Sequence, residues 1–393
     1  MAKKITQRTL AGYRKVKVNA HYFDDLINYM TNKPEKFVER IQKNSYWKKV
    51  GGRMKFDAVI GNPPYQSVIN TDTDNSSLSK QLFPYFIMTS IRLESKYVSL
   101  ITPARWFAGD AQDKSFLKLR EFIRNNNHIS KLYFYKNERE LFSNVEIKGG
   151  VDYFLFDSSH NGDVDFYICQ NNEQELTKRP LFEDGMDVII GDPQDFPILK
   201  KVKEKDFVPL TTITTGRNPF GIIGKESVLN SVTISEYADG YTPIRCKGNV
   251  IRWIKPDEIK KNLEIFRNYK IFISKSAGNP NKDAKVIGMP YVGEPYSSCT
   301  DSLITIGNFD TLEEANNLQK YIKTQFFRFM VSILKSSQNV TQIVYGFVPM
   351  QNFTGESDID WNQDVDSINK QLFDKYGLTD DERSYITNKI KPM

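Results

Sequence analysis

Four consecutive residues combine an amide side chain, a rigid backbone and an aromatic ring. Asn62-Pro63-Pro64-Tyr65 directly follows Phe56-Asp57-Ala58-Val59-Ile60-Gly61, a short apolar run typical of a buried parallel strand. The Asn62 side chain and the Pro63 carbonyl offer two hydrogen-bond acceptors, and the prolines fix φ and stiffen the loop that presents them. Two such acceptors can hold both N–H groups of a planar amine, such as the exocyclic amine of adenine.

That amine is a poor nucleophile because its lone pair is delocalised into the ring, so an enzyme must hold it while a methyl donor approaches. Tyr65 would stack on the base, which has to be flipped out of a duplex at a cost of a few kcal/mol. Ligands of open α/β sheets bind beyond the carboxyl ends of the strands, where these residues lie. We therefore expect Asn62, Pro63, Pro64 and Tyr65 to be catalytic. The alternative is a rigid Pro-Pro turn that only ends a strand.

Alternating strands and helices surround this turn. Residues 21–49 show helical spacing of apolar residues and predict two short helices, with Pro34 in a first helical turn. Further strands are expected at 97–103, 129–134 and 151–156, and helices at 82–91 and 115–125. This βαβ series predicts half of a doubly wound α/β sheet.

Beyond about Lys205 the pattern changes to shorter strands, many turns and interleaved Lys and Arg. We expect a helical, basic amino-terminal arm at 1–53, a catalytic part at 54–205 and an α+β part with carboxyl-terminal helices at 206–393. Residues 312–335 predict one helix with Thr311 as its cap. Gly377 is expected to end a helix.

These segments resemble the adenine-N6-specific DNA methyltransferases of bacterial restriction-modification systems. The resemblance rests on residues 56–66, on Ile101-Thr102-Pro103-Ala104-Arg105-Trp106 and on 147–155, with weaker similarity at 273–278 and 345–350. It implies a partial Rossmann-like class I methyltransferase sheet followed by a target-recognition domain. It also implies S-adenosylmethionine as the methyl donor, with Asn62 and Pro64 beside it, and double-stranded DNA as the substrate.

The sequence departs from the family at one point. Members carry a glycine-rich loop after the first strand of the sheet, which cradles S-adenosylmethionine, and an acidic residue at the end of the next strand. We find neither in this sequence. Three explanations stay open: a partner subunit supplies that part, the chain is a truncated product, or it binds DNA without catalysis. A restriction nuclease is a further expected partner.

DNA contacts are expected from loops that carry Arg, Asn or Lys, because such side chains reach base edges and phosphates. We select Arg105 beside the catalytic loop, Arg217 and Asn218 in the Gly216 turn, and Lys275 near Gly278. Phe220 could stack beside a flipped base, although such a phenylalanine is more often core. The net charge of +6 favours a polyanionic partner only mildly.

Other classes of site fit less well. Cys169, Cys246 and Cys299 form no CxxC pair and none follows a proline, which disfavours zinc, disulfides and cytosine-C5 methylation. Glu146-Ile147-Lys148 matches part of a nuclease motif but lies in the family's glycine turn. We expect no metal. With no run of 18 apolar residues and no secretion signal at the amino terminus, we expect a cytoplasmic protein without a membrane segment.

Two functions therefore compete. The first is site-specific adenine-N6 methylation of DNA. The second is a non-catalytic DNA-recognition or assembly subunit that needs a partner for cofactor binding. Methylation of a protein glutamine would use the same four residues, but the large basic carboxyl-terminal part argues against it.

Overall fold

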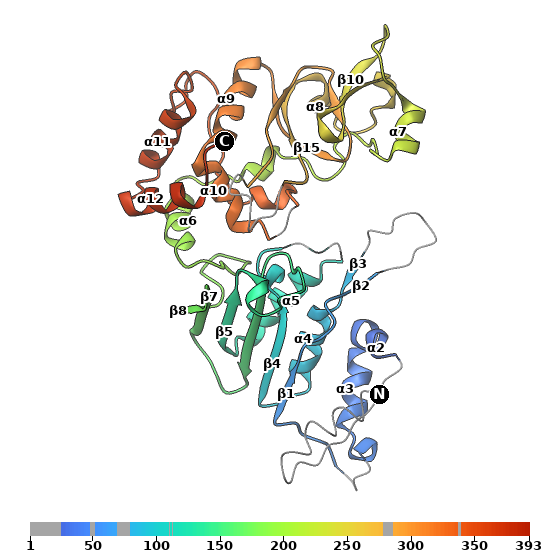
Figure 1. The fold of residues 1–393 in the computed structure, drawn as a ribbon, viewed down its shortest axis with the longest axis vertical. Helices are drawn as coiled ribbons and strands as arrows, with labels where there is room; N and C mark the ends of the chain where they lie inside the picture. The colour runs from blue at the N-terminus through green and yellow to red at the C-terminus, as the bar shows by residue number, and fades with distance from the viewer. Residues whose placement is uncertain are drawn as a thin grey trace.

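The chain folds into two parts that lie one above the other in Figure 1. The computed structural model describes residues 25–47, 52–68, 79–109, 111, 113–277, 286–336 and 339–393. A mixed sheet and its helices form the first part, and two smaller sheets with a group of helices form the second. The molecule is a mixed α/β protein, as expected from the sequence.

The first part is built on a six-stranded sheet in the order β1-β4-β6-β5-β7-β8. Its strands are β1 (Ala58–Gly61), β4 (Tyr97–Pro103), β5 (Ile129–Tyr135), β6 (Val151–Asp157), β7 (Val164–Gln170) and β8 (Glu173–Arg179). β1 runs parallel to β4, and β5 parallel to β7. β6 is antiparallel to both β4 and β5, between which it lies. The expectation of a simple βαβ series is corrected here, because the connection from β5 to β6 contains only a short 3₁₀ helix, η3 (Glu138–Glu140), and β6 returns antiparallel to β5.

One face of this sheet is buried under helices. Helices α4 (Phe83–Arg92) and α5 (Ser115–Asn126) share an apolar core with alternate residues of the strands, such as Val98, Leu132 and Phe154. The intervening residues point to the other face and stay half-buried. There Tyr133 stacks on Tyr153 and Tyr167, at centroid distances of 4.6 and 4.2 Å.

The two short amino-terminal helices are confirmed as α2 (Leu26–Asn32) and α3 (Pro34–Gln42), with Pro34 in the first turn of α3. They pack beside α4, in a cluster that includes Leu93 and Phe56. A 3₁₀ turn, η1 (Asn44–Trp47), follows them. The basic residues expected to form a free arm lie largely in 1–24, outside the described residues.

The second part contains two small sheets. One has the order β14-β10-β11-β9 and the other the order β13-β12-β15. Their strands are β9 (Thr233–Ile234), β10 (Thr242–Arg245), β11 (Ile251–Ile254), β12 (Tyr269–Ser274), β13 (Tyr291–Gly293), β14 (Ser298–Cys299) and β15 (Leu303–Phe309). The helices of the region are α6 (Asp195–Lys203), α7 (Glu226–Val232), α8 (Leu263–Arg267), α9 (Leu312–Lys323), α10 (Gln325–Leu334), α11 (Val365–Lys375) and α12 (Asp380–Lys389).

The long helix expected at 312–335 is two helices, α9 and α10. The break falls at Thr324, which is extended at ψ 152° and whose side chain accepts from the Phe327 N–H as the cap of α10. Thr311 caps α9 in a capping box with Glu314, as expected. Gly377 follows α11 with φ +60°, and the Leu378 N–H bonds back to the Phe373 carbonyl, which confirms it as the C-terminal glycine.

The boundary that the sequence suggests near Lys205 falls just after α6. Ile198, Leu199 and Val202 of α6 are fully buried in the core that contains α9 and α10. α6 lies between the sheet and the carboxyl-terminal helices in Figure 1. We therefore propose that the second part begins near residue 191, because a helix belongs to the part whose core it completes.

Candidate functional site

The Asn62–Tyr65 turn lies where the sequence places it, at the carboxyl end of β1. Asn62 and Pro64 are exposed, Pro63 is buried, and Tyr65 is half-buried. Beyond it the chain forms a small hairpin of β2 (Gln66–Val68) with β3 (Ser79–Gln81), and the Leu82 N–H donates to the Tyr65 carbonyl at 2.9 Å. The turn is thus held at both ends while Asn62 stays exposed.

Tyr65 is anchored on the buried side of the sheet. Its ring contacts the edge of Phe83 at a centroid distance of 6.5 Å and an interplanar angle of 83°. The hydroxyl is buried and has no direct hydrogen-bond partner in the part of the chain that the structure describes. Burial raises the pKa of Tyr65, the Asp152 carboxyl raises it further, and the Asn62 side chain acts in the opposite direction.

Asp152 lies beneath this turn and was not selected from the sequence. Its Oδ1 accepts from the Thr102 hydroxyl at 2.9 Å and from the Trp106 indole N–H at 3.2 Å. Burial raises the pKa of Asp152 to about 7 against these two hydrogen bonds, which lower it. The available signal was a carboxylate at an inward position of an apolar strand, which is rare unless the group has a role.

Arg105 lies beside the turn, as the sequence suggested. It belongs to the 3₁₀ turn η2 (Ala104–Trp106) that follows β4, and its Nη2 donates to Gln66 Oε1 at 3.4 Å. Burial lowers the pKa of Arg105. Because β1 and β4 are parallel neighbours, their two carboxyl-terminal turns meet at one edge of the sheet. The arrangement presents an amide, an aromatic ring and a guanidinium together.

The second part approaches this edge at Gly149. A Cβ on Gly149 would lie 2.4 Å from the Ser336 carbonyl oxygen and 3.4 Å from the Arg105 Cβ, and its φ is +89°. Only glycine fits such a position without strain. The Gly149 turn therefore lets the helical part of the molecule lie against the carboxyl edge of the sheet.

The other predicted DNA contacts lie in the second part. Arg217 is exposed in its turn, and Asn218 has a positive φ of 56°. Lys275 is half-buried, and its ammonium donates to the Asp301 carbonyl. Phe220 is fully buried in the core around β10 and β12. Its predicted stacking beside a base is therefore corrected to a core role, since no part of its ring is exposed.

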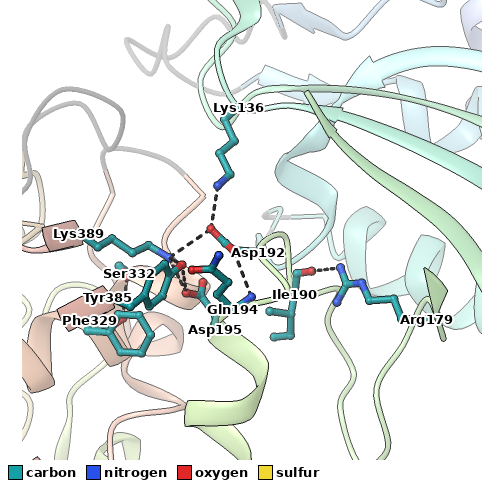
Figure 2. A network of polar contacts seen from close by, with 10 residues as sticks. All are labelled: Lys136, Arg179, Ile190, Asp192, Gln194, Asp195, Phe329, Ser332, Tyr385 and Lys389. Carbon is teal, nitrogen blue, oxygen red and sulfur yellow. Dashed lines mark hydrogen bonds and ion pairs between the residues drawn. The ribbon is translucent and has the colours of Figure 1, made fainter. Parts of the chain in front are cut away.

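A cavity of about 380 Å³ lies between the two parts and was not predicted. An ionic network on its wall is drawn in Figure 2: Asp192 accepts from Lys136 at 2.7 Å and lies 3.8 Å from Lys389, which also pairs with Asp195. Burial acts to raise the pKa of Asp192, but Lys389 and Lys136 lower it overall. Burial raises the pKa of Asp195 in spite of Lys389. This network joins the strand ends of the sheet to α12.

Within the described ranges, residues fit only part of a site for S-adenosylmethionine. Asn62 and Pro64 are exposed and could border a methyl donor. β1 pairs with β4 on one side only, so the described sheet has no strand beyond it that could lead into a glycine-rich loop. These residues alone do not complete the cofactor site. No group of three or more potential metal ligands occurs among them either.

The Asn62–Tyr65 turn lies within the part of the chain that matches a known protein family. Residues 1–142 match the Eco57I restriction-modification methylase family. A protein of Mycoplasma pneumoniae, described as an uncharacterized adenine-specific methylase, is 36% identical over 118 residues, which is 30% of this chain and 27% of that protein. The chain thus spans about a quarter of that curated relative.

Solved structures of restriction-modification enzymes are similar at low sequence identity. The type IIL enzyme MmeI in complex with DNA has a TM-score of 0.45 and 11% identity, over 84% of this chain and 56% of that one. The ATP-dependent type ISP enzyme LlaBIII bound to DNA has a TM-score of 0.40 and 9% identity, over 92% and 31%. The resemblance of this chain to the adenine-specific DNA methyltransferases of restriction-modification systems, first drawn from Asn62–Tyr65 and its flanking strands, is confirmed by the family match and the Mycoplasma relative.

Proposed function

We propose that this protein is a site-specific DNA adenine-N6 methyltransferase of a restriction-modification system. The observation that supports this most strongly is the Asn62–Tyr65 turn, exposed at the carboxyl end of β1 inside the stretch that matches the methylase family. Double-stranded DNA is the proposed substrate, the cytoplasm the proposed compartment and a restriction nuclease a proposed associate.

The chemistry follows from the groups in the turn. The Asn62 amide oxygen and the Pro63 carbonyl accept the two N–H groups of the adenine amine, which holds the amine and increases electron density on its nitrogen. A rigid Pro63-Pro64 backbone keeps the acceptors in place, so little reorganisation is needed in the transition state. Tyr65 stacks on the flipped base and offsets part of the cost of unstacking it.

S-adenosylmethionine would supply an electrophilic methyl group to that nitrogen. Asn62 and Pro64 are the residues of this chain that we expect beside it. The rest of its site must come from residues outside the described sheet, because β1 is the edge strand there.

An alternative function is a DNA-recognition or assembly subunit that binds the cofactor only with a partner. The observation that favours it is the outer edge of β1. Ile60 is 80% exposed, and Ala58 and Gly61 are exposed as well. Natural proteins protect free strand edges with charges, prolines or covering elements, because unpaired backbone groups invite another strand. β1 itself carries no charge or proline, and none of the described strands pairs with its outer edge, which fits a strand that is completed by another polypeptide.

A methyl-transfer assay separates these functions. Purified protein would be incubated with labelled S-adenosylmethionine and mixed-sequence duplex DNA, and N6-methyladenine would be measured by mass spectrometry. An enzyme that is complete in itself methylates DNA, and Asn62→Ala abolishes the product while DNA binding persists. Asn316→Ala, an exposed change within α9 in the second part, is the matched control and should keep full activity.

Absence of product from the wild-type protein, together with retained DNA binding and no saturable S-adenosylmethionine binding, would support the partner-dependent subunit. Label found in protein glutamine instead of DNA would contradict both readings.

A further inference from the structure

Two buried polar atoms beneath the catalytic turn have no direct hydrogen-bond partner among the described residues. They are the Tyr65 hydroxyl and Asp152 Oδ2. Buried polar atoms in native proteins are almost always paired, directly or through ordered water, so two unpaired atoms in one small region need an explanation. One belongs to the turn itself and the other to β6.

The geometry explains why Oδ2 is the free atom. β4 and β6 are paired so that Thr102 lies opposite Asp152. The Thr102 hydroxyl and the Trp106 indole both donate to Oδ1, which leaves Oδ2 as the remaining acceptor of a fully buried carboxyl. A carboxylate oxygen is an acceptor and the Tyr65 hydroxyl has a proton to donate, so the two unpaired atoms are complementary.

Tyr65 and Asp152 also lie within electrostatic reach. The Asp152 carboxyl is the charged group that acts on the Tyr65 hydroxyl. Both side chains face the buried side of the sheet, where Tyr65 contacts Phe83 and Asp152 contacts Trp106. The two residues are therefore neighbours on one face although they are far apart in sequence.

We propose that Asp152 is the positioning residue of the catalytic turn: one buried water accepts from the Tyr65 hydroxyl and donates to Asp152 Oδ2, and this bridge fixes the plane of the Tyr65 ring for stacking on a base. The role in stacking rests on the proposed function; the hydrogen-bonded pair does not. Asp152 does not touch the base, so it acts through Tyr65.

The same carboxyl connects two turns of the site. Through Oδ1 it holds Trp106, whose turn also contains Arg105, and through Oδ2 it holds Tyr65. A ring or guanidinium that is displaced by about 1 Å loses much of its effect on a reacting group, so a shared buried anchor preorganises both. Asp152 links the two turns from the buried side, whereas the Arg105–Gln66 hydrogen bond links them near the surface.

The first test measures the phenol of residue 65 without requiring activity. Tyr65 is replaced by 3-fluorotyrosine in the full chain, and its ionisation is followed by ¹⁹F NMR in the wild-type background and in Asp152→Asn. A carboxyl acceptor holds the phenolic proton, so Asp152→Asn should increase the acid dissociation constant of this phenol by about tenfold, one pKa unit. Thr102→Val, which removes a donor to Oδ1 only, should not increase it.

The matched position is Tyr133 on the opposite face of the sheet. Its fluorinated phenol should ionise at the same pH in all three backgrounds. If the phenol at residue 65 also ionises unchanged in Asp152→Asn, the pair does not exist and the proposal is overturned.

A reciprocal variant covers the case in which Asp152→Asn fails to fold. Tyr65→Phe removes only the hydroxyl, and the Asp152 carboxyl is followed by ¹³C NMR. Loss of a donor to the carboxylate should raise the pKa of Asp152. An unchanged pKa of Asp152 in Tyr65→Phe would equally overturn the proposal.

The second test uses methyl transfer and so depends on the proposed function. Tyr65→Phe and Asp152→Asn should each lower kcat about tenfold, and the double variant should lose no more than either single one, because both changes remove one unit. Additive losses, near a hundredfold, would contradict the linked pair. Lack of activity in every variant would contradict the proposed function of the isolated chain, while the NMR result would still decide on the pair.

Discussion

Asn62 and Asp152 differ in how their place in the site can be recognised. Asn62 belongs to a contiguous motif and is exposed, and its amide is the acceptor that we propose for the adenine amine. Asp152 is fully buried, and its carboxyl acts on other side chains through hydrogen bonds. The first type can be recognised along the chain. The second is defined by the register of β4 and β6, which no short motif encodes.

The raised pKa of Asp152 makes stability depend on pH. Burial raises this pKa from 3.8 to about 7, so the folded state binds the proton more tightly than the unfolded state. The stabilisation by the protonated Asp152 carboxyl is therefore complete below pH 3.8 and is lost as the pH rises to about 7. Over this range the free energy of unfolding should fall by at most ~1.4 kcal/mol per pH unit. Urea unfolding across this range should show a smaller decrease with pH for Asp152→Asn than for the wild type.

Asp157→Asn is the control for that measurement. Its carboxyl lies at the exposed end of the same strand, where Ser159 lowers its pKa, so this variant should not remove the decrease between pH 4 and 7. Identical pH profiles for Asp152→Asn and the wild type would show that Asp152 is not buried as described.

At the scale of elements, local patterns predicted more than did long-range ones. The sequence predicted strands β1, β4, β5 and β6 and helices α4 and α5, because apolar periodicity is a local signal. It also predicted the caps Thr311 and Gly377, because capping residues lie next to the helix that they end. The direction of β6 was missed, since apolar runs carry no direction. The break at Thr324 was missed because apolar residues continue through it. Phe220 was selected as a residue that could stack beside a flipped base, whereas tertiary packing buries it.

The capping box of α9 contributes measurably to the free energy of unfolding. The Thr311 hydroxyl accepts from the Glu314 N–H, and the Glu314 carboxylate accepts from the Thr311 N–H. Thr311→Ala should lower the free energy of unfolding by about 1 kcal/mol. Thr387→Ala, an exposed change inside α12, should have almost no effect in the same urea titration. Equal effects of the two changes would contradict the capping role.

A substitution at Gly149 should destabilise the protein more than the loss of this cap does. In Gly149→Ala the new Cβ would lie 2.4 Å from the Ser336 carbonyl oxygen, in addition to the strain of a φ of +89°. We expect a loss of about 2–4 kcal/mol in the free energy of unfolding. Gly185→Ala separates the two causes, because Gly185 has a φ of +71° but no atom within 4 Å of such a Cβ. It should cost about 1 kcal/mol.

At the scale of the whole molecule, the sheet and the second part are joined around α6 and the network of Figure 2. Asp192 and Asp195 precede or begin α6, Lys136 follows β5, and Lys389 ends α12. A sequence change near Lys205 could not reveal this joint, because α6 resembles a helix of either part until its neighbours are known. Among the described residues, no helix has the length and hydropathy needed to cross a bilayer.

Removal of Lys389 should weaken this joint. In Lys389→Met the buried Asp195 loses its ion pair and keeps the Tyr385 hydroxyl, 2.9 Å away, as a donor. Leaving a buried carboxylate unpaired should cost about 3 kcal/mol of unfolding free energy. Lys391→Met, an exposed neighbour, should be close to neutral. A neutral Lys389→Met would show that the network contributes nothing to the association of the two parts.

The central claim is that Asn62 holds the adenine amine during methyl transfer, and a methylome of the native cells tests it most directly. A chromosomal Asn62→Ala allele would be compared with the wild type by mapping N6-methyladenine across the genome, with equal protein levels verified. Because any partner is present, the assay does not depend on whether the isolated chain is complete. Loss of methylation from one sequence motif, with all other motifs unchanged, is the predicted result; an unchanged methylome would contradict the assignment.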